Sequence, residues 1–367
     1  MQIILFSNSC WSIKNFRKNL IKNLLKNHKV IIIAPFDGYQ SELKNLGCKM
    51  INIKINKNKV NFFSDFFLII NLFKILSSYK KKSILLNFTI KPLIFGTFVS
   101  RILKIPSLCM ITGLGTVFIK KNLLTVFVLF LYKISFKNVF HVFFQNKEDK
   151  NFFIQNKIIT LKNCSLIPGS GVDLKKFRYQ KYTKKKITTF LLVARLLKEK
   201  GIIEYIEAAK MLKKNKFKIK MNLVGSFVGN NQSSIEKKTI FDANKNNEIN
   251  YIGFLEDIRP QIKKADCMVL PSYREGTPRS LLEGASMGKP IVTTDAVGCR
   301  EVVRSGENGF FCKIKSYNSL YLMLIKFHQL SFEKKKKMSR ASYKLASSIF
   351  DEKKVINAYV NKIRKFI

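Results

Sequence analysis

Short apolar runs alternate with amphipathic segments along this chain, and the alternation restricts the possible folds more than any other feature. The runs that we expect to form strands are residues 3–6, 30–34, 50–53, 84–87, 107–111, 142–145 and 165–167, then 190–194, 220–224, 250–252, 267–270 and 291–293. Segments with helical periodicity, such as 15–26 and 62–76, lie between them. Strands separated by helices form a mostly parallel sheet with helices on both faces. The expected fold class is therefore α/β, with two doubly wound, Rossmann-like domains facing a cleft.

A turn-forming run, Pro168-Gly169-Ser170-Gly171, and a polar, basic stretch after it separate the two halves. We expect a first domain at residues 1–170, a linker at 171–186 and a second domain at 187–350. The tail after residue 316 has a helical pattern only, and a helix over 351–367 is free to pack back on the first domain. A length of 367 residues suits two domains of ordinary size.

The charge balance is extreme but leaves the partner open. There are 67 Lys and Arg against 23 Asp and Glu, a net charge of +44. Such a charge attracts phosphates of any kind, in nucleic acid, nucleotides or anionic lipids. The excess is nearly all Lys and comes with abundant Asn, Ile and Phe, a mixture that codon bias in an AT-rich genome also produces.

The sequence favours neither a metal centre nor a chain that is secreted or anchored in a membrane. The seven Cys form no C-x-x-C pair and sit mostly in apolar runs, which is typical of buried thiols in a reduced, cytosolic protein. The three His lie far apart, and His141 is expected to be packed or hydrogen-bonded rather than a ligand. No D-x-D and no P-loop occur. The first residues read as a strand, not as a signal peptide, and the longest apolar run, 123–134, is too short to span a membrane.

One segment carries the strongest indication of chemistry, Pro271-Ser272-Tyr273-Arg274-Glu275-Gly276-Thr277-Pro278-Arg279-Ser280-Leu281-Leu282-Glu283-Gly284-Ala285. An apolar strand leads into a loop, and Pro278 then favours a first helical turn. Unpaired N–H groups at residues 277–281 and the helix dipole would attract phosphate or sugar oxygens. Glu275 precedes the helix and Glu283 follows on its second turn, so two carboxylates are available for the hydroxyl groups of a sugar and a ribose.

A second cluster follows the first strand of the second half, where Arg195 and Lys200 are placed to converge at the carboxyl end of that strand. Two cations beside a helix N-terminus suit a departing diphosphate, whose charge grows in the transition state. Solvated surface cations are the alternative explanation, and it applies better to Lys198 than to Arg195.

These motifs resemble the retaining family-4 glycosyltransferases of the GT-B fold. The resemblance rests on two glutamates eight residues apart, on the preceding R-x4-K pair and on further matches such as Gly171-Val172-Asp173, Val224-Gly225 and the stretch 298–309. It implies that Arg195 and Lys200 hold the diphosphate, that Glu275 contacts the donor sugar near its reacting carbon and that Glu283 binds the ribose. The donor-binding set that it implies is completed by Gly225, Gly253, Gly276, Thr277, Pro278, Arg279, Ser280 and Leu281.

The N-terminal half resembles a narrower group, bacterial enzymes that extend sugars linked to polyprenyl diphosphate. The matching residues lie at 11–17, Thr112-Gly113-Leu114-Gly115 and Phe144-Gln145-Asn146. This resemblance implies Asn15, Arg17, Thr112 and Gly113 on the acceptor side. Two departures stand out: no His occupies the position of Thr112-Gly113, and Asn8-Ser9-Cys10 replaces the usual Gly pair of the first loop. The roles of that His and of that loop are therefore not transferred.

The expected function is transfer of a hexose or N-acetylhexosamine from a nucleotide sugar, with UDP as the expected nucleotide, to a polyprenyl-diphosphate-linked saccharide. The resemblance implies retention without a protein base, no metal and no other cofactor, because cations and a helix terminus would replace the metal. The acceptor implies a peripheral enzyme on the inner face of the cytoplasmic membrane. Basic, Phe-rich segments at 62–74 and 118–137 fit an anionic leaflet, although helices that simply cover a sheet would show the same apolar positions.

Two alternatives remain. A nucleic-acid-binding protein fits the charge, yet no helix-turn-helix, RRM or KH signature is legible and the paired glutamates have no purpose there, so no nucleic-acid partner is expected. A soluble synthase that makes a sugar phosphate on the same fold would share the donor site and differ only in its acceptor.

Overall fold

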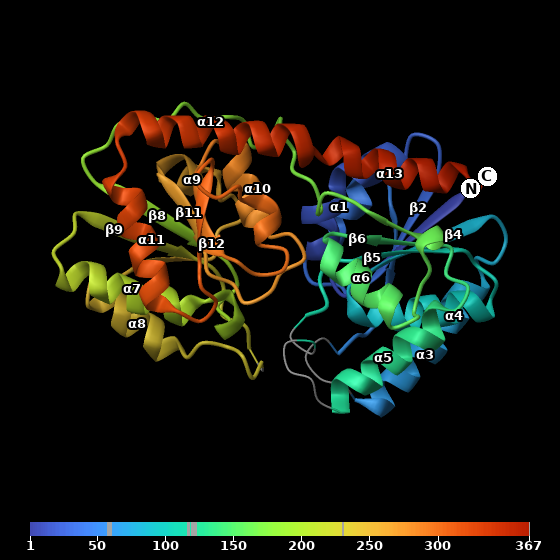
Figure 1. Cartoon of the computed structure of the whole chain (residues 1–367). Helices are drawn as coiled ribbons and strands as arrows, with labels where there is room; N and C mark the ends of the chain where they lie inside the picture. The colour runs from blue at the N-terminus through green and yellow to red at the C-terminus, as the bar shows by residue number, and fades with distance from the viewer. Residues whose placement is uncertain (57–60, 116–117, 119–122, 230, 367) are drawn as a thin grey trace. The chain divides into compact units, whose positions relative to one another are not determined.

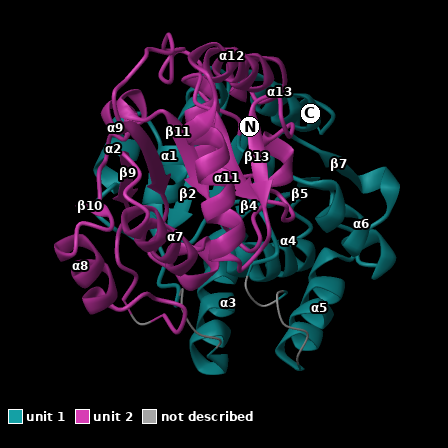
Figure 2. Ribbon diagram, turned by 60° about the vertical axis from the view of Figure 1, so that its left-hand side comes forward, with its two compact units in different colours: residues 1–170, 353–367 teal, residues 171–352 magenta. Residues whose placement is uncertain are grey.

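The computed structural model describes residues 1–56, 61–115, 118, 123–229 and 231–366. The chain forms two compact units (Figure 2). Unit 1 contains Met1–Ser170 and Lys353–Ile367, and unit 2 contains Gly171–Glu352. The segment expected as a linker, 171–186, belongs to unit 2, because its side chains at Val172, Phe177 and Tyr182 are buried there.

Unit 1 is built on a parallel sheet with the strand order β3-β2-β1-β4-β5-β6-β7. Its strands are β1 (Gln2–Phe6), β2 (Lys29–Ala34), β3 (Lys49–Asn52), β4 (Ser83–Phe88), β5 (Ser107–Ile111), β6 (His141–Phe144) and β7 (Cys164–Leu166). Its helices are α1 (Cys10–Leu24), α2 (Gln40–Asn45), α3 (Phe62–Ser77), η1 (Pro92–Gly96), α4 (Thr97–Ile102), α5 (Leu123–Phe136), α6 (Lys147–Gln155), η3 (Leu161–Asn163) and α13 (Glu352–Arg364) (Figure 1). The central strands are apolar on both faces because helices cover both sides of the sheet.

Helix α13 comes from the end of the chain and packs on the sheet of unit 1. It buries Val355, Tyr359 and Ile363, which are spaced by four residues and therefore share one helix face. Tyr359 contacts the rings of Phe88 and Phe143, from strands β4 and β6. This contact joins the last helix to the middle of a sheet whose first strand begins at residue 2.

Unit 2 repeats the architecture with the strand order β10-β9-β8-β11-β12-β13, again all parallel. Its strands are β8 (Thr188–Val193), β9 (Ile219–Val224), β10 (Asn250–Gly253), β11 (Cys267–Leu270), β12 (Ile291–Thr294) and β13 (Gly309–Cys312). Its helices are η4 (Lys198–Lys200), α7 (Ile202–Lys214), α8 (Lys237–Lys245), α9 (Arg259–Lys264), α10 (Arg279–Ser286), η5 (Arg300–Val302), α11 (Tyr317–Gln329) and α12 (Phe332–Ile349). The expected α/β class with two Rossmann-like domains is confirmed.

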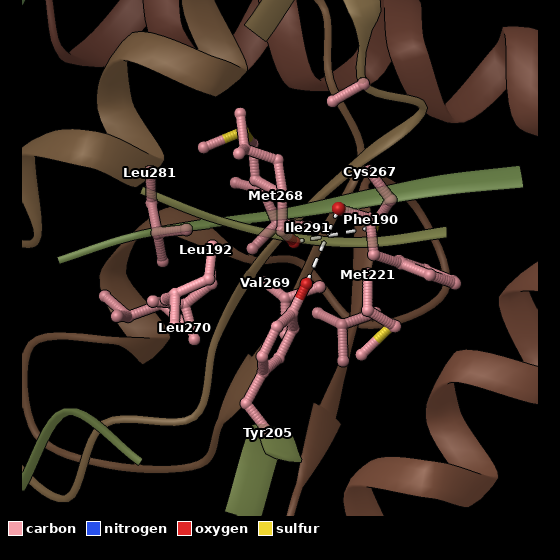
Figure 3. Packing of buried hydrophobic residues seen from close by; sticks show 14 of the residues in the cluster. Phe190, Leu192, Tyr205, Met221, Cys267, Met268, Val269, Leu270, Leu281 and Ile291 are labelled. Atoms are coloured by element: carbon pink, nitrogen blue, oxygen red, sulfur yellow. Dashed lines mark hydrogen bonds between the residues drawn. The ribbon is translucent and has the colours of Figure 1, made fainter. Parts of the chain in front are cut away.

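Tyr205 of α7 shows how the core of unit 2 holds a polar atom (Figure 3). Its ring is fully buried, and its hydroxyl donates to the carbonyl of Asn222 at 2.9 Å, with the carbonyl of Phe190 at 3.5 Å. Burial raises the pKa of the Tyr205 phenol well above its usual value. The hydrogen bonds compensate the hydroxyl for its lost water and fix α7 against strands β8 and β9.

Strand β13 was absent from the sequence expectation. It has four residues and begins with Gly309, a residue that disfavours strands. The glycine is required, because a Cβ at this position would lie 2.1 Å from the carbonyl oxygen of Ile291 on β12.

None of the helices in the described part of the chain combines the length and apolar character needed to cross a bilayer.

His141 predicts a pH dependence of stability in unit 1. The side chain is 2% exposed, its Nε2 lies 2.8 Å from Ser165 Oγ, and burial with the charges of Lys362 and Lys365 lowers its pKa from 6.5 to about 4. The unfolded chain therefore binds a proton between pH 6.5 and 4 that the folded chain does not, and stability falls with pH in that window. Between pH 7 and pH 4.5, we expect the free energy of unfolding to fall by about 2–3 kcal/mol less in His141→Gln than in the parent protein.

The fluorescence of Trp11, the one Trp of the chain, reports urea unfolding of unit 1. Equal losses of unfolding free energy in the parent and His141→Gln proteins would contradict this assignment. The other His of unit 1, His28, is less buried, and His28→Gln serves as the control.

Candidate active site at the carboxyl ends of strands β8 and β11

The order of strands in unit 2 reverses between β8 and β11, which pair side by side at the centre of the sheet. In open parallel sheets, ligands bind outside the carboxyl ends of the strands at such a switch point. Arg195 follows β8, and the loop that contains Glu275 follows β11. The topology therefore brings the two predicted clusters to one edge of the sheet.

Three glycines allow the loops at this edge to pack backbone against backbone. A Cβ at Gly225 would lie 1.8 Å from the carbonyl oxygen of Ala194, one at Gly201 would lie 2.1 Å from that of Pro271, and one at Gly298 would lie 2.2 Å from that of Gly276. No side chain fits at such distances. Glycine at these positions therefore allows the loops after β8, β9, β11 and β12 to pack closely against one another.

Lys200 and Glu275 form the central ion pair of the candidate site. Lys200 Nζ lies 2.5 Å from Glu275 Oε1, and both side chains are largely buried, with 18% and 14% exposed. The same carboxylate oxygen accepts a hydrogen bond from Ser272 Oγ at 2.8 Å. Among the described residues, Glu275 Oε2 has no partner. One oxygen is therefore fixed by the protein, and the other can accept a hydrogen bond from a ligand.

Ser272 is a positioning residue that the sequence analysis missed. Its side chain is fully buried and also contacts the carbonyl oxygen of Glu199 at 2.9 Å, which links the Glu275 loop to η4. The backbone N–H of Tyr273 donates to the same carbonyl. A serine two residues after a buried strand and three residues before a predicted catalytic glutamate is the signal that could have identified it.

Cys299 reports the electrostatics around the ion pair. The thiol is fully buried, and burial together with the charge of Glu275 raises its pKa to about 12. Like the other six Cys, it is a free, buried thiol, as the sequence predicted.

Glu283 is held by a residue of its own helix. Arg279 Nε lies 3.0 Å from Glu283 Oε1, and Arg279 also donates to the carbonyl oxygen of Gly171 at 2.9 Å. Burial raises the pKa of the Glu283 carboxyl, and Arg279 opposes that shift. Glu283 lies on α10, as expected. Arg279, which the resemblance places in the donor-binding set, forms an ion pair with Glu283.

The start of α10 differs from the expectation in two details. Pro278 is the N-cap and the helix begins at Arg279, because Pro278 has a ψ of 115°. The N–H of Leu281 is not unpaired, since it donates to the carbonyl of Pro278 at 3.1 Å. Gly276, Thr277 and Pro278 are buried in the loop before the helix, and Ser280 is half-buried in its first turn.

The remaining predicted donor residues lie at neighbouring strand ends. Gly225 directly follows β9 and Gly253 ends β10, and the N–H of Gly225 donates to the carbonyl of Gly253 at 2.9 Å. Arg195 is exposed and has no side-chain partner among the described residues. Arg195 follows β8 at the sheet edge that also carries the Lys200–Glu275 pair, and an anion can bind its exposed guanidinium without breaking a contact among the described residues.

The predicted acceptor residues lie in unit 1 and differ in accessibility. Thr112 is exposed and follows β5, and Gly113 adopts a φ of +109°. Asn15 is half-buried on α1 and donates to the carbonyl of Trp11. Arg17 is 6% exposed, with its guanidinium 4.7 Å from the centre of the Phe88 ring. Its burial favours a packing role for Arg17 over contact with an acceptor.

The comparisons with known proteins agree with the fold. Residues 173–345 match the family described as glycosyl transferases group 1, and residues 2–146 match the glycosyl transferase 4-like family. The structure resembles HepE of Anabaena, solved with UDP and glucose, with a TM-score of 0.80 and 17% identity over all of both chains. The fold and the site at the β8–β11 edge thus define a glycosyltransferase of the GT-B class.

The chain is 31% identical over 340 residues to N,N'-diacetylbacillosaminyl-diphospho-undecaprenol alpha-1,3-N-acetylgalactosaminyltransferase of Campylobacter jejuni, covering 87% of each chain. It is 28% identical over 193 residues, 49% of each chain, to UDP-Gal:alpha-D-GlcNAc-diphosphoundecaprenol alpha-1,3-galactosyltransferase of Escherichia coli. This chain belongs to the group 1 glycosyltransferases, and the resemblance stated from the sequence is confirmed.

Gly225→Ala tests the packing that forms the site. The new Cβ would collide with the Ala194 carbonyl, so the loops after β8 and β9 must separate. We expect the free energy of unfolding of unit 2 to fall by about 1–3 kcal/mol. The midpoint of its thermal unfolding, measured by calorimetry, should then fall by about 3–8 °C. Gly229→Ala is the matched control, because nothing lies within 4 Å of its Cβ position. Equal midpoints for the two variants would refute the packing argument.

Proposed function

We propose that this glycosyltransferase moves a sugar from a UDP-linked donor to a saccharide carried on polyprenyl diphosphate, with retention of the anomeric configuration. The observation that carries the donor half is the largely buried Lys200–Glu275 pair at the switch point where the exposed Arg195 follows β8. The acceptor half is supported by the names of the two relatives, both of which act on diphosphoundecaprenol-linked sugars.

In the proposed donor complex, Arg195 and Lys200 bind the diphosphate and Glu283 accepts hydrogen bonds from the ribose hydroxyls. We propose that the donor sugar binds Oε2 of Glu275, while Lys200 and Ser272 hold Oε1. The charge on the leaving diphosphate grows as the glycosidic bond breaks, so cations fixed before the reaction stabilise the transition state more than the ground state.

The proposed transfer needs no protein base. The acceptor hydroxyl oxygen attacks the anomeric carbon on the face that the phosphate leaves, the bond from that carbon to the phosphate oxygen breaks, and the hydroxyl proton passes to the leaving phosphate. We propose that Arg195 and Lys200 take the electrostatic place of a metal. No group of three metal-ligating side chains occurs among the described residues, a fact that by itself does not test this point.

Two substitutions separate binding from catalysis. We expect Arg195→Ala to lower kcat about 100-fold with a small change in donor KM, and Glu283→Gln to raise the Kd for UDP about tenfold. Transfer is measured by mass spectrometry, with a panel of nucleotide sugars and a polyprenyl-diphosphate monosaccharide, and UDP binding by calorimetry. Arg340→Ala is the control, because Arg340 is exposed on α12 and has no side-chain partner among the described residues.

Full activity of Arg195→Ala would refute the role given to Arg195. Transfer to a soluble sugar phosphate, with none to the polyprenyl-linked acceptor, would instead support the synthase alternative. Stabilisation by oligonucleotides and not by UDP would favour the nucleic-acid alternative.

We further propose that unit 1 attaches peripherally to an anionic membrane, the inner face of the cytoplasmic membrane, through helices α3 and α5. Both helices project from the same end of unit 1 (Figures 1 and 2). The centroids of the Phe62 and Phe127 rings lie 5.9 Å apart. Helix α3 turns Leu68, Leu72 and Leu76 toward the core. A second set of apolar side chains on the two helices faces solvent: Phe62, Phe63, Phe66, Phe67, Phe73, Leu123, Leu124, Val126 and Phe130.

Covering the sheet does not explain this second set. Phe63 is 82% and Leu123 is 89% exposed. Exposing such large apolar side chains to water costs free energy unless a partner covers them. The acid of α3, Asp65, is paired with Lys91, while Lys74, Lys133 and Lys137 near these helices are exposed. Apolar rings with a basic surround suit an anionic bilayer surface. Lysines 57 and 59, which precede the first of these basic segments, and lysines 120 and 121, which belong to the second, lie outside the described residues.

Phe63→Ser/Leu123→Ser tests membrane attachment. We expect its partition into vesicles of phosphatidylcholine with 30 mol% phosphatidylglycerol to fall at least tenfold in 0.15 M salt, because two large apolar side chains are lost from the contact. Leu322→Ser, at a site 58% exposed in unit 2, is the control and should leave partition unchanged. Binding that Phe63→Ser/Leu123→Ser leaves intact, in a protein that still folds by circular dichroism, would overturn the proposal.

A further inference from the structure

A basic hollow of about 460 Å³ lies in unit 1 where the end of α13 meets strands β6 and β7. The cations at its rim are Lys362, Arg364 and Lys365 from the last turns of α13 and the residue after it. Its other lining residues are Asn361, Ala358, Phe143 and Ser165. The hollow therefore combines positive charge, an amide, a hydroxyl and an apolar wall.

The hollow is separate from the acceptor residues expected from the sequence. Phe143 and Ser165 are paired in register within β6 and β7, and β7 is the edge strand of the sheet. Thr112 and Gly113 instead follow the carboxyl end of β5. Nothing in the proposed transfer reaction uses α13, Phe143 of β6 or Ser165 of β7.

The described residues do not compensate the positive charge in the hollow. Within the described ranges no carboxylate lines it, and none of its three cations forms an ion pair there. The cations also act on one another: burial and the charge of Lys365 lower the pKa of Lys362. Both lysines lower the pKa of the neighbouring His141, whose ring contacts Ser165 Oγ.

A helix dipole accounts for only part of this arrangement. The C-terminus of a helix favours cations in its last turn, which explains why Lys362 and Arg364 are tolerated. It does not explain why they surround a hollow that also offers the Asn361 amide and Ser165 hydroxyl. Charge-assisted bonds from several cations to one multiply charged group are the strong hydrogen bonds of proteins, and phosphate has the oxygens to accept them.

We propose that this hollow is a second binding site, distinct from the donor and acceptor sites, for a phosphate-bearing anion. Lys362, Lys365 and Arg364 neutralise the phosphate, and Asn361 and Ser165 supply further hydrogen bonds. The apolar wall of Phe143 and Ala358 contacts the group that carries the phosphate. Phosphate of this kind occurs both in free soluble anions and in the headgroups of anionic lipids.

Calorimetry with inorganic pyrophosphate tests the site for free phosphates. UDP at saturation first occupies the donor site, so that only further binding is measured. We expect Lys362→Gln/Lys365→Gln to weaken that binding at least tenfold and to leave the Kd for UDP unchanged. Lys22→Gln/Lys26→Gln removes the same charge from exposed positions near the end of α1 and serves as the control.

The second arm uses vesicles of phosphatidylcholine with 30 mol% phosphatidylglycerol and the Phe63→Ser/Leu123→Ser background, which removes the aromatic contact. Loss of pyrophosphate binding identifies a soluble anion as the ligand, whereas loss of vesicle binding alone identifies a lipid headgroup. The imidazole resonances of His141 give a local readout at pH 7 that does not depend on a variant. They should shift when the ligand is added, while those of His328 in unit 2 stay fixed.

The proposal is overturned if Lys362→Gln/Lys365→Gln binds both probes like the control variant, or if neither probe shifts the resonances of His141. Either failure leaves the donor site intact, because UDP binding is measured in the same samples. Loss of UDP binding with retained pyrophosphate binding would instead count against the proposed function.

Discussion

The close backbone approach at the carboxyl ends of β8, β9 and β11 is the constraint on which the site depends. Gly225 and Gly201 let carbonyl groups of neighbouring loops come nearer than any side chain allows. This packing sets Lys200 against Glu275 and puts Ser272 beneath the same carboxylate. Because the pair is largely buried, neither charge can be removed without leaving the other poorly solvated. This burial distinguishes the pair from a solvent-exposed surface contact, and it is the basis of the donor-site proposal.

The cations behind the net charge of +44 have different surroundings in different parts of the chain. At the β8–β11 edge, one guanidinium remains exposed while the nearby ammonium is paired with Glu275. On α3, the buried Asp65 is neutralised by Lys91, and the apolar rings beyond it face water. At the end of α13, cations face a hollow that no carboxylate of the described residues lines. Codon bias is an alternative explanation for scattered Lys, but it does not explain these local arrangements.

The parts that the sequence predicted well are those with a strong pattern in consecutive residues. Buried parallel strands such as 107–111 and 267–270 are continuous apolar runs, and the motif around Glu275 and Glu283 is carried by a fixed spacing. The parts that it missed depend on contacts between distant segments. Strand β13 begins with Gly309 because a side chain there would collide with the carbonyl of Ile291. Ser272 gains its role beside Glu199, and Arg17 of α1 packs on Phe88 of β4. Of these three, only Ser272 has a local signal in the sequence, its place shortly after a buried strand and three residues before Glu275.

The most direct test of the account is a crystal structure of the chain with UDP bound. The account predicts the diphosphate between the Arg195 guanidinium and the Lys200 ammonium, with the ribose hydroxyls on Glu283 and with Glu275 still held by Ser272. A diphosphate bound elsewhere in unit 2, or one that contacts neither Arg195 nor Lys200, would contradict it.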